Sequence, residues 1–133
     1  MKGINDRLQV IKKALENEPL IELALVYGST ARGDYRPDSD ADIAVAGKKK
    51  FSISTLADIA VRIEKQTGIT IDIIDLYSSE GLILYESICG IPLVDNPPLR
   101  TEFTIKALGF KEDFLPQLNA LKLERARRFS SGY

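Results

Sequence analysis

The sequence contains no histidine, no tryptophan and a single cysteine, Cys89. Without histidine, neither a Ser-His-Asp triad nor a His-ligated zinc site can form within this chain. One cysteine cannot make an internal disulfide, and because Cys89 lies in an apolar stretch we expect it to pack in the core. These absences exclude histidine-based chemistry and leave oxygen ligands as the candidates for a catalytic site.

Long apolar runs are also absent. No run approaches the roughly 18 residues of a membrane span, and the N-terminus has no basic-then-apolar signal pattern. The 133 residues, with 44% hydrophobic and 28% charged content, are ordinary for one globular domain. We therefore expect a single cytoplasmic domain, 1–133, with no membrane partner.

Charge is distributed unevenly along the chain. Residues 19–98 carry 7 Lys/Arg and 12 Asp/Glu, a balance of −5, whereas residues 99–133 carry 7 and 4, a balance of +3. An acidic middle segment suits a divalent cation better than a nucleic-acid backbone, although acidic residues on a solvated surface would give the same charge balance. No stable nucleic-acid binding is expected.

Hydrophobic spacing and chain breakers predict the elements. An N-terminal helix within 1–18 precedes strands 20–27, 41–47 and 69–76, with a turn at Gly28 after the first strand and a helix between the second and the third. That helix has Ser52 or Ser54 as its N-cap and Gly68 just past its end. The run 48–50 of three lysines is expected to be a solvated turn rather than a phosphate contact.

The C-terminal third is predicted to be mainly helical. Ser78 or Ser79 caps a helix running to about residue 90, and a short strand, 91–94, follows. Pro98 suits the first position of a helical segment over 98–130, whose apolar stripe runs from Phe103 to Leu121 and is kinked or broken by Pro116. This order predicts an α/β (α+β) fold, with a small mixed β-sheet over 20–95 and flanking helices.

An acidic pair begins the second strand. Asp40 and Asp42 are two residues apart, so they share a strand face with Cα atoms about 6.6–6.8 Å apart. Two such carboxylates repel each other unless they lie in open solvent or a cation lies between them. Hard oxygen ligands suit Mg²⁺ or Mn²⁺ rather than zinc. The alternative interpretation of this pair alone is a solvated turn.

Further residues favour a phosphate site beside this pair. Gly28 and Ser29 follow the first strand directly, where successive N–H groups can hold phosphate oxygens. Arg32 could bind the same anion. Asp72 could supply a third carboxylate from the third strand; Asp75, three residues further on, points to the opposite face, so only one of the two can join. Together these residues would hold a metal-chelated nucleoside triphosphate.

The stretch "GSTARGDYRPDSDADIAV" resembles the signature of the DNA polymerase β-like nucleotidyltransferases, in which Gly-Ser is followed ten residues later by Asp-x-Asp. Its surroundings resemble the small prokaryotic branch called minimal nucleotidyltransferases, as does the length of the chain. "TGITIDIIDL" is similar to their segment that bears the third carboxylate. The resemblance covers residues 20–120.

This resemblance implies transfer of a nucleoside monophosphate from a triphosphate, AMP from ATP, to a hydroxyl group. Gly28 and Ser29 would hold the β- and γ-phosphates, and Arg32 would bind phosphate or order the loop. By the same resemblance, the ligands of two Mg²⁺ ions, or of Mn²⁺ in their place, would be Asp40, Asp42 and Asp72. The family pattern places the third ligand at the first acid of "DIIDL", which favours Asp72 over Asp75.

The resemblance also implies a partner. Proteins of this branch are commonly encoded beside a HEPN-domain protein, and several such pairs behave as toxin and antitoxin. The resemblance therefore implies that this chain is an antitoxin that attaches AMP to a tyrosine of a HEPN ribonuclease toxin. The stripe from Phe103 to Leu121 could dock that partner or pack on the chain's own sheet. One alternative is modification of a small molecule such as an aminoglycoside, for which the second subunit of a homodimer could complete the pocket. The other is an antitoxin that acts by binding alone, against which the three intact carboxylates argue.

Overall fold

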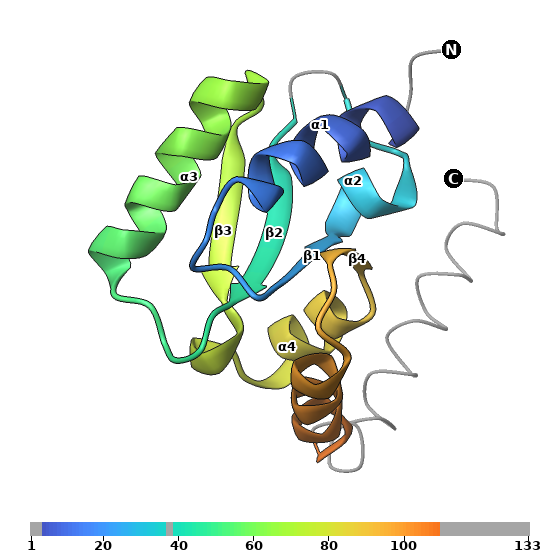
Figure 1. Cartoon of the computed structure of the whole chain (residues 1–133). Coiled ribbons are helices and arrows are strands. Elements are labelled where there is room, and N and C mark those ends of the chain that lie inside the picture. The colour runs from blue at the N-terminus through green and yellow to red at the C-terminus, as the bar shows by residue number, and fades with distance from the viewer. Residues whose placement is uncertain (1–3, 37–38, 110–133) are drawn as a thin grey trace, which may run out of the picture.

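The computed structural model describes residues 4–36 and 39–109. The elements in chain order are α1 (Ile4–Glu16), β1 (Leu23–Tyr27), α2 (Gly28–Arg32), β2 (Ala41–Ala46), α3 (Ile53–Thr67), β3 (Ile71–Asp75), the 3₁₀ turn η1 (Leu76–Ser78), α4 (Gly81–Ile88) and β4 (Ile91–Val94). A further helix occupies residues 97–109, the last that the structure describes. Figure 1 shows these elements arranged around one sheet.

The sheet has the strand order β3-β2-β1-β4. β1 is antiparallel to both β2 and β4, whereas β2 and β3 are parallel and are connected through α3. A parallel pair needs such a crossover, because a tight turn can join only antiparallel strands. The mixed sheet with flanking helices confirms the fold class expected from the sequence.

Helices cover both faces of this sheet, and the strands distribute alternate residues between them. We call the first the α1/α3 face; its core includes Ile11, Val26, Ile43 and Ile59. The second, the α4 face, is covered by α4, η1 and the helix 97–109. Its core residues are Leu23, Leu25, Tyr27, Ala44, Ala46, Leu76, Leu84, Phe103 and Ala107. Because both faces are buried, β1 and β2 appear in the sequence as nearly continuous apolar runs.

Several predicted boundaries are confirmed. α1 ends at Glu16, within the expected range 1–18, and the Ser52 side chain accepts a hydrogen bond from the Thr55 N–H (3.1 Å) at the start of α3. Gly68 ends α3 with a φ of 73°. The strands are shorter than expected, since β1 begins at Leu23 and β3 spans Ile71–Asp75. The strands therefore lie where the sequence predicts them but are shorter.

Other expectations are wrong. A five-residue helix, α2, rather than a turn, begins at Gly28. Neither Ser78 nor Ser79 caps α4: Ser78 lies in η1, and the Ser79 hydroxyl donates to the Asp75 carbonyl oxygen (2.8 Å), which binds it back to the end of β3.

Two further corrections concern the C-terminal third. Cys89 is exposed rather than packed in the core. The last described helix begins at residue 97, one position before Pro98, because the Asn96 side chain accepts from the Leu99 N–H (3.2 Å). The stripe beyond residue 109 and Pro116 lie outside the described residues. No helix in the described part of the chain is long and apolar enough to cross a membrane.

Candidate active site

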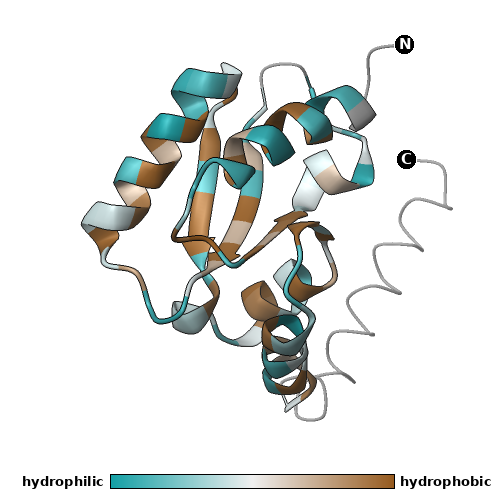
Figure 2. Ribbon diagram, viewed as in Figure 1, coloured by the Kyte–Doolittle hydropathy of each residue, from teal (hydrophilic) through white to brown (hydrophobic). Residues whose placement is uncertain are grey.

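The strand register places two of the predicted ligands side by side. Asp42 of β2 is the direct partner of Asp72 of β3, and on its other side Asp42 pairs with Tyr27 of β1. Directly paired residues project from the same face of a sheet with Cβ atoms about 5 Å apart. This is the α4 face, because Ala44 and Ile74, two residues further along, pack there. Figure 2 shows a hydrophilic band near the same end of β2 and β3.

Negative charge accumulates at this end of the sheet. Burial raises the pKa of the half-buried Asp42 carboxyl, and the charges of Asp72 and Asp40 raise it further. The positive charge of Arg32 lowers this pKa, whereas Glu86 raises it. Carboxylates that oppose one another's ionisation in this way are stabilised by a cation placed between them.

Tyr27 pairs with Asp42 across the sheet, on the side away from Asp72, and is 7% exposed. Burial raises the pKa of its phenol to about 12, with contributions from Asp42, Asp72 and Glu86. The phenol therefore stays protonated at neutral pH, where it adds no charge to the cluster. Its ring packs in the core of the α4 face, so this residue connects the apolar and acidic parts of that face.

Gly28 brings the predicted phosphate loop against the carboxylates. It follows β1 directly and has a φ of +71°, in the left-handed region that glycine adopts without strain. A Cβ atom built on Gly28 would lie 2.4 Å from Oδ2 of Asp42, so no other residue fits without displacing that carboxylate. Ser29, the next residue, is half-buried. The structure thus places Gly28 against Asp42, with Ser29 next to it in the chain.

Arg32 ends α2 near the same cluster. Its Nε lies 3.2 Å from Oδ2 of Asp34, and the two side chains are 65% and 62% exposed. Exposed pairs of this kind contribute about 0–1 kcal/mol, so Asp34 holds Arg32 only weakly. Because its charge also acts on Asp42, Arg32 is in electrostatic reach of the cluster.

Asp75 has a different role from Asp72. It is 3% exposed, and its carboxylate accepts hydrogen bonds from the Phe51 N–H (2.6 Å) and the Tyr77 N–H (2.9 Å). These bonds tie the end of β3 to the start of α3. Asp72 is exposed and lies beside Asp42, so the geometry favours Asp72 as the third carboxylate of the site.

Glu86 of α4 is a fourth carboxylate near the site, and the sequence-based prediction missed it. It is exposed, and its charge raises the pKa of both Asp42 and Tyr27. One signal was present: Glu86 is the only charged residue in "GLILYESICGIPLV", residues 81–94. An isolated acid in an apolar helix and strand indicates that it faces something other than the core.

The donor set fits a magnesium ion in its chemistry. All candidates are carboxylates, the ligands that Mg²⁺ and Mn²⁺ prefer. Over residues 4–36 and 39–109, no three acidic side chains stand close enough together to enclose an ion as they are placed. The pair Asp42 and Asp72 is set by strand register, and a third carboxylate would have to move toward it.

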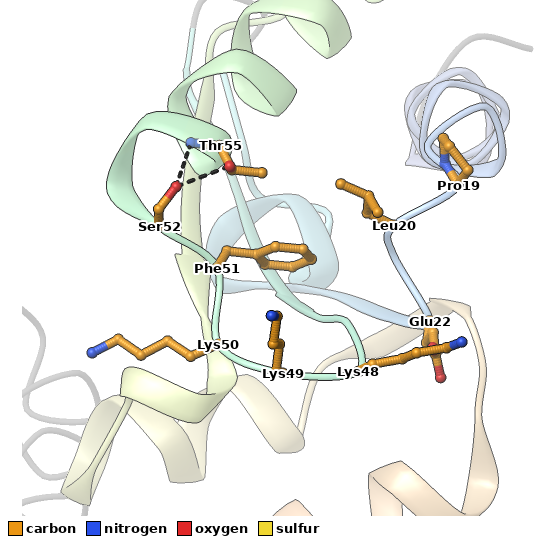
Figure 3. Close-up of a pocket in the computed structure, with 9 residues that line it drawn as sticks. All are labelled: Pro19, Leu20, Glu22, Lys48, Lys49, Lys50, Phe51, Ser52 and Thr55. Atoms are coloured by element: carbon orange, nitrogen blue, oxygen red, sulfur yellow. Dashed lines mark hydrogen bonds between the residues drawn. The ribbon is translucent and has the colours of Figure 1, made fainter.

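A cavity of about 620 Å³ lies at the opposite end of the sheet. It is bounded by residues just before β1 and just after β2: Pro19, Leu20, Glu22, Lys48, Lys49, Lys50, Phe51, Ser52 and Thr55. Figure 3 shows the Phe51 ring directed toward Leu20 across this space, while Lys50 points away from it. None of the predicted site residues lines this cavity, so we place the candidate active site at the carboxylates.

Comparison with known families identifies the class of protein. Residues 9–98 match the family described as "Polymerase beta, Nucleotidyltransferase". The chain therefore belongs to the polymerase β family of nucleotidyltransferases. No curated protein sequence matches the chain.

Solved structures show the same fold at low sequence identity. A chain from a toxin–antitoxin crystal structure with AMP-PNP is 20% identical, with a TM-score of 0.70, over 90% of this chain and 98% of that chain. The complex of tri-AMPylated Shewanella oneidensis HEPN toxin with MNT antitoxin gives 17% identity and a TM-score of 0.65, over 92% and 98%. The MntA–HepT toxin–antitoxin structure gives 18% and 0.64, also over 92% and 98%.

Proposed function

We propose that this chain transfers AMP from ATP to a hydroxyl group in a Mg²⁺-dependent reaction, with a tyrosine of a HEPN toxin as the acceptor. The chain would thus be the antitoxin of a two-protein system in the cytoplasm. The observation that carries the proposal is the close approach of Gly28 to Asp42, which is itself in register with Asp72. Solved structures of similar fold, one with AMP-PNP and one with an AMPylated HEPN toxin, support the choice of donor and acceptor.

The triphosphate would bind at the start of α2. Backbone N–H groups in the first turn of a helix have no carbonyl partner within that helix. Gly28 lies against Asp42, and the N–H groups of Gly28 and Ser29 would bind the β- and γ-phosphates there. Arg32, whose one ion pair among the described residues is the exposed one with Asp34, would add a positive charge on the same side.

The carboxylates would hold two divalent ions. Asp42 and Asp72, which are register partners, would hold them together with Asp40, two residues before Asp42. Mg²⁺, or Mn²⁺ in its place, supplies charge neutralisation of the triphosphate and lowers the pKa of the attacking hydroxyl. The protein contributes mainly position and a fixed electrostatic environment.

The test uses ATP labelled on the α-phosphate, Mg²⁺ and the purified chain. The acceptor is the HEPN protein encoded by the neighbouring gene, or an aminoglycoside in a parallel reaction. We expect label on the HEPN protein, none after EDTA treatment, and none when its acceptor tyrosine is replaced by phenylalanine. Label on the drug alone would identify a small-molecule enzyme. A complex that neutralises the toxin without any label would identify an antitoxin that acts by binding.

A further inference from the structure

Arg7 of α1 contacts the connection between α2 and β2 in two places. Its Nη2 donates a hydrogen bond to the carbonyl oxygen of Ser39, the residue immediately before Asp40. Its Cζ also lies 4.4 Å from the centroid of the Tyr35 ring, in a cation–π contact. Figure 1 shows the part of this connection that follows α2, residues 33–36, passing close to α1. One side chain on the first helix therefore holds a segment about thirty residues away in the sequence.

The burial of Arg7 has no obvious benefit for stability. The side chain is 8% exposed, yet its Nε is buried without a hydrogen-bond partner, and no carboxylate of the described residues pairs with it. A buried charge without an ionic partner is unfavourable. Arg62 is the opposite case: its Nε and Nη2 donate to the two carboxylate oxygens of Glu18 at 3.0 and 2.8 Å.

The contacts of Arg7 bear directly on Asp40. The Ser39 N–H and hydroxyl both donate to the Arg36 carbonyl oxygen, at 3.0 and 2.7 Å. On the other side of Asp40, the Ala41 N–H donates to the Thr70 carbonyl oxygen (2.9 Å). Asp40 thus lies between a residue fixed by β-sheet pairing and a residue whose carbonyl is held by Arg7.

We propose that Arg7 is a positioning residue that fixes Asp40 relative to Asp42 by holding the Ser39 carbonyl and the Tyr35 ring. The proposal rests on the proposed function, because it assumes that Asp40 is a metal ligand. Interactions that orient a ligand in this way change metal affinity or activity by about 10–100-fold when they are removed.

Four variants of the full chain separate positioning from stability. Arg7→Met removes the charge and the hydrogen bond but keeps an extended side chain. Tyr35→Phe keeps the ring beneath the guanidinium, whereas Tyr35→Leu removes it. Arg62→Met is the matched control, because it also removes a helix arginine, but one that bonds Glu18 rather than the connection that precedes Asp40; it leaves Glu18 buried and unpaired.

Three measurements are made on each variant: the exchange rate of the Ser39 amide, Mn²⁺ affinity from the EPR signal of free Mn²⁺, and Tm. We expect Arg7→Met to exchange Ser39 faster and to bind Mn²⁺ about 10–100-fold more weakly, with Tm unchanged or higher. Tyr35→Leu should change in the same direction and Tyr35→Phe should match the wild type. Arg62→Met should lose Tm but keep its Mn²⁺ affinity.

Unchanged Mn²⁺ affinity in Arg7→Met overturns the positioning role, and so does a loss of affinity that Arg62→Met shares. A wild-type chain that binds no Mn²⁺ and transfers no label overturns the proposed function instead. In that case the exchange rate of the Ser39 amide still decides whether Arg7 holds this connection. An unchanged rate in Arg7→Met would show that it does not.

Discussion

The two faces of the sheet receive alternate residues of the same strands and use them differently. Ala41, Ile43 and Val45 of β2 are fully buried on the α1/α3 face. On the α4 face the same strand presents Ala44 and Ala46 at one end but Asp42 at the other. One face is therefore apolar along the whole strand, whereas the other changes from core to carboxylate within two residues.

This difference shows how a chain of 133 residues combines a stable sheet with a charged site. The α1/α3 face, and the half of the α4 face that lies away from Asp42, supply the apolar burial that offsets the loss of chain entropy on folding. The end of the α4 face that carries Asp42 has less apolar packing and holds negative charges that repel one another. Stability and activity should then respond to different substitutions, even at adjacent positions.

Asp42→Asn should produce the largest functional effect. The change removes a carboxylate that is proposed to hold metal while keeping nearly the same volume. We expect label transfer from ATP to fall by on the order of 10²–10³-fold or more, with the circular dichroism spectrum unchanged. Retained activity in this variant would contradict the assignment of Asp42 as a metal ligand, whatever the acceptor is.

Gly28→Ala should produce the next largest effect. The new Cβ would collide with Asp42 Oδ2 and would hold an L residue at a φ of +71°. We expect transfer to fall by about 10²-fold, because small displacements of reacting groups have effects of this size. The measurement is initial rate at saturating ATP.

Gly68→Ala is the matched control for this collision. Gly68 has nearly the same backbone angle, +73°, but a Cβ there would meet nothing within 4 Å. It should cost about 1 kcal/mol of stability from backbone strain and leave the rate of the folded enzyme unchanged. Equal losses of activity in the two variants would mean that strain, rather than the contact with Asp42, explains the effect.

Ile43→Ala tests the other face one residue away from Asp42. Ile43 is fully buried in the core of the α1/α3 face, so the cavity should cost about 2–5 kcal/mol in the free energy of unfolding, measured by urea denaturation. Activity per folded molecule should remain close to that of the wild type. A large loss of activity in fully folded Ile43→Ala would show that the two faces are coupled.

Much of this architecture can be predicted from the sequence. Gly-Ser directly after one apolar strand and Asp-x-Asp at the start of the next place the site at one end of the sheet, and the structure brings Gly28 and Asp42 together there. The choice between Asp72 and Asp75 follows from strand periodicity, and the hydrogen bonds accepted by Asp75 agree with it. Local patterns carry this information because neighbouring strands fix the relative positions of their residues.

The remainder depends on contacts between distant segments. Nothing in the spacing of α1 indicates that Arg7 reaches Ser39 and Tyr35, since that contact requires the helix to pack beside the connection. Glu86 acts on the pKa values of Asp42 and Tyr27 only because α4 lies on their face of the sheet. The prediction that Cys89 packs in the core is wrong because its apolar neighbours do not indicate that α4 ends just before it. Sequence periodicity predicts a residue's face on its own element but not which other element covers it.

The smallest effect expected concerns stability and pH. The pKa of Asp42 is raised in the folded chain, first by burial and then by its acidic neighbours, so the folded state binds this proton more tightly than the unfolded chain does. This contribution to stability is present at acid pH and is lost as the pH rises through the folded-state pKa. At pH 7 and without metal, Asp42→Asn should therefore raise Tm, by a few degrees at most because the half-buried carboxylate is screened by water.

Thermal denaturation of the wild type and Asp42→Asn from pH 3 to pH 8 checks the sign of the difference in Tm and the pH range over which it appears. The difference in Tm should vanish below the unfolded pKa of about 3.9, where Asp42 is protonated in both states. Millimolar Mg²⁺ should raise the Tm of the wild type at pH 7 more than that of Asp42→Asn, because only the folded wild type holds the complete carboxylate set. If Asp42→Asn is less stable than the wild type at pH 7 without metal, the Asp42 carboxylate stabilises the sheet. Charge repulsion would then not be what distinguishes the α4 face from the α1/α3 face.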